Sequence, residues 1–212
     1  MKFKIITASL VLLTTLVAID FYNSTDNTFL GDNDSQDKSF EEFAELAEQG
    51  DVDAQSILAG AYFFGEGVPK DDIKGLLMYR DAAKQGDVRA QYMLGVIFSM
   101  DDVRNYKEAL KWYAKAAEQN FASAQFQIGR MYSKGKGVLE DDEKTIYWFK
   151  KAANQGHHDA QYHLANIYIK GQRVKRDLKQ AKYWIEKALE STDENIVRRS
   201  KHLWKSYSLE KY

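Results

Sequence analysis

Apolar and small residues recur along most of the chain with the spacing of amphipathic helices. In the first of two alternating patterns, an alanine is followed by a leucine or isoleucine four residues later and by an aromatic residue eight residues later. With about 100° of rotation per residue, these positions form one stripe on a helix. The alanines that begin the pattern are Ala54, Ala90, Ala124 and Ala160, at intervals of 36, 34 and 36 residues. The regular interval predicts an array of stacked repeats.

A second helical pattern follows the first in every repeat. A small or short residue comes first, at Gly75, Ala109, Thr145 and Ala181, and a bulky one stands three residues later, at Met78, Trp112, Trp148 and Trp184. Because the tryptophans repeat in register, we interpret them as core residues rather than as a ligand-binding stack. Glycine or asparagine at each turn favours a left-handed helix cap. The aspartate pairs 71–72 and 141–142 fit helix N-termini, so we favour capping over acid–base catalysis for them.

These patterns predict an all-α protein with no sheet, because no alternating run of β-branched residues is present. About four repeats span residues 39–190, and residues 40–50 match only the end of a second helix, so the array opens with half a unit. Residues 191–212 carry no repeat signature and are predicted to form a C-terminal capping helix and tail.

The beginning of the chain differs from the array. Lys2 and Lys4 precede an uncharged, largely apolar run that ends before Asp20, which predicts a secretory signal peptide at residues 1–19. An uncleaved N-terminal membrane anchor is the alternative. Residues 20–38 are polar and are predicted to form a disordered linker. We therefore expect a periplasmic or secreted protein or, if the segment is not cleaved, an inner-membrane-anchored protein with its repeats outside the cytoplasm.

The overall charge is balanced, with 30 Lys and Arg residues against 31 Asp and Glu residues. This balance argues against a nucleic-acid partner, because nucleic-acid binding by phosphate neutralisation needs a basic excess. The chain has no cysteine, which excludes disulfides, a thiolate nucleophile and cysteine-type zinc sites. The three histidines at 157, 158 and 163 lack the helical spacing of a metal site. We predict no cofactor and no metal.

The consensus A-x-x-x-L-G-x-x-Y-x-x-G-x-G-V, followed by D-x-x-K-A-x-x-W-x-x-K-A-A-x-Q-G, resembles the Sel-one-like repeat (SLR), a relative of the tetratricopeptide repeat. The resemblance covers residues 40–190. It implies antiparallel helix pairs wound into a right-handed α-solenoid. It also implies a scaffolding role, such as those found in bacterial secretion, envelope signalling and host contact.

Positions three, six and ten of the first helices lie away from the predicted core stripe. In arrays of helical pairs the first helices line the concave surface, so we expect a partner-binding groove there. Its residues change from apolar in the early repeats to basic and amide-bearing in the later ones. The candidates are Met93, Val96, Gln127, Arg130, Lys134, His163, Asn166 and Lys170.

We therefore predict an exported scaffold of the bacterial envelope that binds another protein or a peptide segment through this groove. An immunity or accessory role and a regulatory role both remain open. Membrane contact is expected only through the N-terminal segment. The alternative is a hydrolase acting on β-lactam or peptidoglycan. It is disfavoured because the S-x-x-K matches at Ser133 and Ser208 have no accompanying S-D-N or K-T-G motif.

Overall fold

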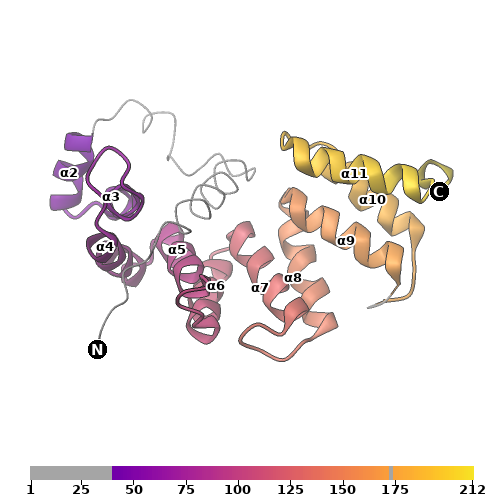
Figure 1. Ribbon diagram of the computed structural model, residues 1–212, viewed down its shortest axis with the longest axis horizontal. Coiled ribbons are helices and arrows are strands. Elements are labelled where there is room, and N and C mark those ends of the chain that lie inside the picture. The colour runs from indigo at the N-terminus through magenta and orange to yellow at the C-terminus, as the bar shows by residue number, and fades with distance from the viewer. Residues whose placement is uncertain (1–39, 172–173) are drawn as a thin grey trace. The chain divides into compact units, whose positions relative to one another are not determined.

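A computed structural model describes residues 40–171 and 174–212 (Figure 1). The predicted export segment (1–19) and linker (20–38) lie outside these residues. The described chain is all-α and has no strand, as the sequence predicts. Its helices are α2 (Phe40–Glu48), α3 (Val52–Phe64), α4 (Asp72–Lys84), α5 (Val88–Ser99), α6 (Tyr106–Glu118), α7 (Ala122–Lys134), α8 (Asp142–Asn154), α9 (His158–Lys170), α10 (Leu178–Ala188) and α11 (Glu194–Ser206), and the 3₁₀ helix η2 (Leu209–Lys211) follows.

The chain divides into two compact units between Trp112 and Tyr113, within α6. In the first unit, α2 precedes the pair α3 and α4, and α5 follows. In the second unit, α7 pairs with α8 and α9 pairs with α10, while α11 packs on α9 and α10. The helix pairs therefore follow the two alternating sequence patterns, as expected for an α-solenoid.

Side-chain caps fix where the helices begin. Asp71 and Asp141 accept hydrogen bonds from the backbone N–H groups three residues later, at 2.9 Å and 2.8 Å, and so cap α4 and α8. The capping role predicted for these aspartates is confirmed. The backbone N–H of Lys144, ahead of the side chain of Lys144, lowers the pKa of Asp141. These carboxylates therefore hold helix ends, where they also complement the helix dipole.

Small residues let the paired helices approach each other closely. A Cβ atom added to Gly129 of α7 would lie 2.5 Å from Cδ1 of Phe149 in α8. Phe149 is itself buried, so the ring occupies the space that a side chain at position 129 would need. The predicted role of the small residue at this repeat position is confirmed here.

A glutamine repeated in every unit joins each first helix to the helix before it. This glutamine follows the starting alanine, and its Nε2 donates to a backbone carbonyl eight residues earlier, at 3.0–3.3 Å in all four repeats. The four glutamines are Gln55, Gln91, Gln125 and Gln161, and their acceptors are the carbonyls of Ala47, Ala83, Ala117 and Ala153. Each of these carbonyls, at the end of the preceding helix, also accepts a backbone N–H from the turn three residues later, so the glutamine supplies a second donor there.

Two of these glutamines are linked to a second glutamine. Gln85 donates to the Oε1 of Gln55, and Gln155 donates to the Oε1 of Gln125, both at 2.8 Å. Each pair therefore ties the end of a second helix to the first helix of the same repeat. The repeat consensus contains the turn glutamine in its final Q-G, but the sequence analysis predicted no bond for it.

Candidate partner-binding face

Six of the predicted groove residues lie in the second unit, on α7 and α9, and we call this set the α7–α9 face. On each helix the three residues follow one another at intervals of three and four, which places them on one stripe. All six are partly or fully exposed. The members are Gln127, Arg130 and Lys134 of α7 and His163, Asn166 and Lys170 of α9.

Arg130 is held in place by two neighbours on its own helix. Its Nη1 donates to the Oε1 of Gln127 at 3.3 Å, and its guanidinium lies 5.7 Å from the ring centroid of Phe126. Within residues 40–171 and 174–212, no ion pair involves Arg130, Lys134 or Lys170. Their charges are therefore not neutralised by a carboxylate of the described chain.

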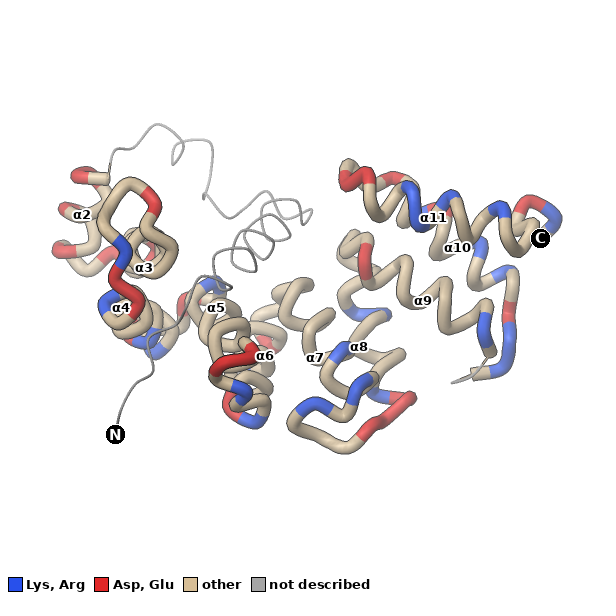
Figure 2. The backbone as a smooth tube through the Cα atoms, in the orientation of Figure 1, with Lys and Arg blue, Asp and Glu red and all other residues tan. Residues whose placement is uncertain are grey.

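The α7–α9 face carries a positive potential that shifts two titratable groups. Arg130 is the main cause of the lowered pKa of Lys134, followed by burial and by the charge of Lys136. Burial, followed by the charges of Arg199, Arg130, Lys134 and Lys170, lowers the pKa of His163 to about 4. Every charge that acts on His163 is positive, so this face should attract anionic groups. Figure 2 shows Lys and Arg residues continuing from the end of α9 into the segment before α10.

Arg199 of α11 belongs to this environment, and the sequence analysis did not identify it. Its guanidinium lies 4.0 Å from the ring centroid of Tyr162, and its Nη1 lies 3.5 Å from Oδ1 of Asp159. Because α11 has no repeat signature, comparing equivalent positions of the repeats could not place Arg199 beside α9. Its proximity follows from the packing of α11 on α9.

His163 lies deeper in the structure than a solvent-facing groove residue would. Its imidazole centroid is 5.5 Å from that of Phe149, with nearly parallel planes, and 5.6 Å from that of Phe126. The buried His157 packs against the same Phe126 ring in a tilted arrangement, with the ring centroids 4.5 Å apart. His163 is therefore largely a packing residue below the cations, and its neutral form suits that position.

His157 is the N-cap of α9, a role that the sequence analysis missed. Its Nδ1 accepts a hydrogen bond from the backbone N–H of Ala160 at 3.3 Å, in the position that Asp51 and Asp87 occupy in earlier repeats. Burial, followed by the charges of His158 and His163, lowers the pKa of His157 to about 3, although a hydrogen bond to its own backbone opposes this. The sequence did carry a signal for this role, because the equivalent positions of two earlier repeats are the capping residues Asp51 and Asp87.

The structure corrects two of the predicted groove residues. Met93 and Val96 of α5 are only 2% and 7% exposed, so the prediction that they line an open groove is wrong. The reason is that α5 is apolar between Ala90 and Ile97 apart from Gln91, and every residue of this stretch is buried. An outward position on a helical wheel stays exposed only where no other part of the chain covers it. The apolar half of the predicted groove is therefore absent at these positions.

Neither S-x-x-K match lies in a recognisable catalytic arrangement. Ser133 belongs to the last turn of α7, directly before Lys134 and the left-handed cap Gly135. Ser208 occupies the turn that leads into η2. In the described ranges, no group of three His, Asp or Glu residues could hold a metal ion. No described helix is long and apolar enough to cross a membrane.

Four Sel1 repeats are recognised along the chain, at residues 52–87, 88–121, 122–157 and 158–193. The chain belongs to the Sel1 repeat family. The resemblance to the Sel-one-like repeat is therefore confirmed. The repeat boundaries enclose the pairs α3–α4, α5–α6, α7–α8 and α9–α10. Sel1 repeats are typical of protein–protein interaction, and the fold is generally a non-catalytic scaffold.

Two solved Sel1-type structures share the fold. One is c5321, a protective antigen present in uropathogenic Escherichia coli strains that displays an SLR fold. It is 30% identical, with a TM-score of 0.72, over 94% of this chain and 44% of that chain. The other is a Sel1 repeat protein from Oxalobacter formigenes, 25% identical with a TM-score of 0.71, over 89% of this chain and 86% of that chain.

Two curated relatives match about half of the chain. An exopolysaccharide production negative regulator of Rhizobium meliloti is 28% identical over 118 residues, which are 48% of this chain and 44% of the relative. The F-box protein At1g70590 of Arabidopsis thaliana is 30% identical over 102 residues, 48% of this chain and 28% of the relative. The matches thus span less than half the length of either relative.

Proposed function

We propose that this chain is a scaffold that binds an acidic segment of another protein across the α7–α9 face. The proposal rests above all on the cluster of positive charges around His163, to which Arg130, Lys134, Lys170 and Arg199 all contribute. A carboxylate-rich segment would supply the negative charge that the described chain does not provide to Arg130, Lys134 and Lys170. The partly exposed amides of Gln127 and Asn166 offer donors and acceptors to the backbone of such a segment.

The first test measures whether acidic peptides bind through these cations. The purified chain is presented with a library of short random peptides, and the affinity of enriched peptides is measured by fluorescence anisotropy. We expect enrichment of peptides rich in Asp and Glu. Reversal of two charges, in Arg130→Glu/Lys134→Glu, should weaken binding by about tenfold or more, because opposed charges become like charges.

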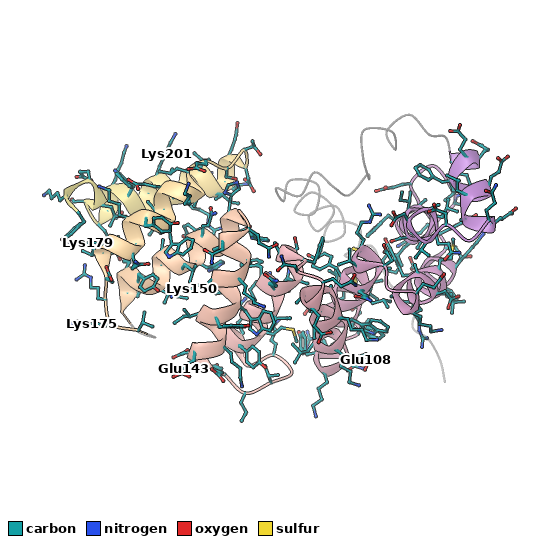
Figure 3. The ribbon with its side chains drawn as sticks, turned by 180° about the vertical axis from the view of Figure 1, so that it is seen from behind. Glu108, Glu143, Lys150, Lys175, Lys179 and Lys201 are labelled. Atoms are coloured by element: carbon teal, nitrogen blue, oxygen red, sulfur yellow. The ribbon has the colours of Figure 1, made fainter. Side chains whose placement is uncertain are left out.

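A matched control separates a specific face from general attraction to a basic surface. Lys179→Glu/Lys201→Glu makes the same change in net charge in the same unit, at exposed positions on α10 and α11 (Figure 3). This control should keep the affinity of the unaltered chain. If the two double variants lose affinity equally, or if the library yields no acidic peptides, the proposal is wrong.

We propose a regulatory role as the specific form of this scaffold. The support is the match to a relative named as a negative regulator of exopolysaccharide production. Deletion of the gene from its host, followed by measurement of secreted polysaccharide, would test this form. An unchanged polysaccharide level in the deletion strain would remove the support.

We also propose export to the bacterial envelope, on the basis of the basic and apolar residues 1–19. Fractionation of expressing cells and mass spectrometry of the N-terminus would test it. Export predicts the protein in the periplasm or medium with a shortened N-terminus, or in the inner membrane with its repeats accessible from outside. Recovery of the full-length chain from the cytoplasm alone would contradict export.

A further inference from the structure

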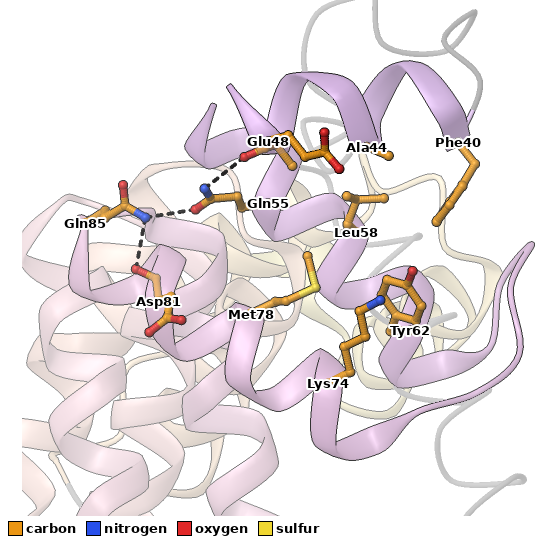
Figure 4. Close-up of a pocket in the computed structure, with 11 residues that line it drawn as sticks. Phe40, Ala44, Glu48, Gln55, Leu58, Tyr62, Lys74, Met78, Asp81 and Gln85 are labelled. Carbon is orange, nitrogen blue, oxygen red and sulfur yellow. Dashed lines mark hydrogen bonds between the residues drawn. The ribbon is translucent and has the colours of Figure 1, made fainter. Parts of the chain in front are cut away.

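The first unit contains a pocket of about 560 Å³ between α2, α3 and α4 (Figure 4). Phe40 of α2, Leu58 and Tyr62 of α3, and Met78 of α4 line it, and Lys74 stands at its edge. A volume of this size lies in the range of small-ligand sites. The pocket belongs entirely to the first unit and does not involve the α7–α9 face.

The last repeat shows what fills the same space elsewhere in this chain. Three repeats further on, each residue of the pocket has a counterpart, and Trp184 stands in place of Met78. Trp184 is only 6% exposed and belongs to a hydrophobic cluster built from the other counterparts. The corresponding pairs are Phe40 with Ile146, Leu58 with Leu164, Tyr62 with Tyr168, and Met78 with Trp184.

The pocket is therefore explained by Met78, which stands where the other repeats have tryptophan. The other repeats have tryptophan in this column, at 112, 148 and 184, and a methionine side chain fills less of the space than an indole does. Ala44 adds to the opening, because its counterpart, Lys150, extends toward the ring of Tyr168, with Nζ 5.9 Å from the ring centroid. The pocket thus retains the walls of a tryptophan site without the tryptophan.

Several contacts fix the distances between the pocket walls. Gln55 donates to the carbonyl of Ala47 at 3.2 Å and so joins α3 to α2, while Gln85 donates to Gln55 at 2.8 Å and joins α4 to α3 (Figure 4). On the other side, the rings of Phe40 and Tyr62 meet edge to face, with centroids 6.0 Å apart. These contacts hold the three helices apart at the spacing of the repeat, so the space does not close around Met78.

The charges around the pocket narrow the choice of occupant. Glu48 and Asp81 line one part of it, where their counterparts in the last repeat are the neutral Asn154 and the basic Lys187. Asp81 already pairs with Lys84 at 3.2 Å, and the Nζ of Lys74 lies 3.7 Å from the ring centroid of Tyr62, so Glu48 is the carboxylate left for an occupant. Glu48 is exposed, and within the described part of the chain it forms no ion pair. An occupant that places an aromatic ring against Leu58 and Tyr62 would therefore gain from a cation next to that ring.

We propose that this pocket receives a large aromatic side chain, with a basic residue beside it, from a partner protein. The ring takes the place that Trp184 occupies in the last repeat and packs against Leu58, Tyr62 and Phe40. The neighbouring cation lies toward Glu48. This inference goes beyond the proposed function, because it concerns a second site on the first unit with the opposite preference for charge.

The experiment uses a short peptide with lysine on both sides of a central tryptophan, and the same peptide with alanine in place of tryptophan. The methionine methyl groups of the full chain are isotope-labelled, and their NMR signals are followed during titration. The chain has only five methionines, so Met78 reports on the pocket and Met131 reports on the second unit. We expect a saturable shift of the Met78 signal with the tryptophan peptide only, and no shift of the Met131 signal.

The matched variant is Met78→Trp, which restores the residue of the other repeats and fills the space from within. It should keep the helical content of the chain and lower the affinity for the tryptophan peptide by about tenfold or more. Ala44→Lys, which copies Lys150, provides a second way to obstruct the pocket if Met78→Trp does not fold. Arg130→Glu/Lys134→Glu should bind this peptide unchanged, so failure of the proposed function would not be mistaken for failure of this site.

Three results would overturn the inference. The first is the absence of a saturable Met78 shift in the folded chain. The second is unchanged peptide affinity in both pocket variants. The third is self-association of the chain that Met78→Trp abolishes, which would assign the pocket to a second copy of this chain instead of a partner.

Discussion

The buried His157 and the half-buried His163 should make the fold sensitive to mild acid. Their pKa values, about 3 and about 4, lie far below the ordinary value of 6.5. Well above pH 6.5, at about pH 8, both histidines are neutral in the folded and unfolded states and do not change stability with pH. As the pH falls below 6.5, the unfolded chain binds protons that the folded chain does not bind, so the free energy of unfolding decreases. The decrease continues until the pH reaches the folded pKa values.

The size of the effect follows from these pKa values. At about pH 5, an unfolded histidine is almost fully protonated, whereas the folded His157 and His163 remain mostly neutral. Each histidine then costs about 2 kcal/mol relative to about pH 8, at roughly 1.4 kcal/mol for each pH unit below 6.5. Together they should remove about 4 kcal/mol, a large part of the stability of an ordinary domain.

The variant His157→Asn isolates one of these contributions. Asparagine can still cap α9 through its side-chain oxygen, but it does not titrate. The variant should lose some stability at every pH, because the contact of His157 with Phe126 disappears. The change in stability between about pH 8 and about pH 5 should nevertheless shrink by about 2 kcal/mol. The lost contact lowers the stability of the variant equally at both pH values, so it does not affect the change in stability between them.

The assay is urea denaturation followed by far-ultraviolet circular dichroism at both pH values. His202→Asn is the matched control, because it makes the same substitution at an exposed position of α11. NMR titration of the histidine rings gives a direct check on the same reasoning. Titration of His157 near pH 6.5, or equal pH dependence of the original chain and His157→Asn, would refute the burial argument.

Two further substitutions test the contacts that build the repeat. Gly129→Ala should lower the free energy of unfolding by about 1–3 kcal/mol in urea denaturation, because the new Cβ would clash with the buried ring of Phe149; unchanged stability would show that the ring can move aside. Gln161→Leu should cost about 0.5–1.5 kcal/mol, because the carbonyl of Ala153 loses the buried amide of Gln161 and keeps only its backbone donor from the turn. The control Gln180→Leu changes an exposed glutamine and should alter stability by less than about 0.5 kcal/mol.

Much of the fold could be predicted from the sequence because the repeat is encoded locally. The spacing of alanines, leucines and aromatic residues determines which side of each helix packs inward, and Asp71 and Asp141 mark helix starts by a hydrogen bond only three residues long. The small residue Gly129 predicted a close contact between two helices, because the repeat pattern places it on the packed side of its helix. All these features depend on neighbours within one helix or one helix pair.

The tertiary structure decided which outward-facing positions remain open. Met93 and Val96 fit the outward stripe, but the rest of the chain buries them, and Arg199 comes from a helix without any repeat signature. The pocket in the first unit has a sequence signal, methionine in a column of tryptophans, yet one departure does not show whether the neighbouring helices close the gap. Local periodicity specifies the direction in which a side chain points, whereas exposure depends on what distant segments place in front of it.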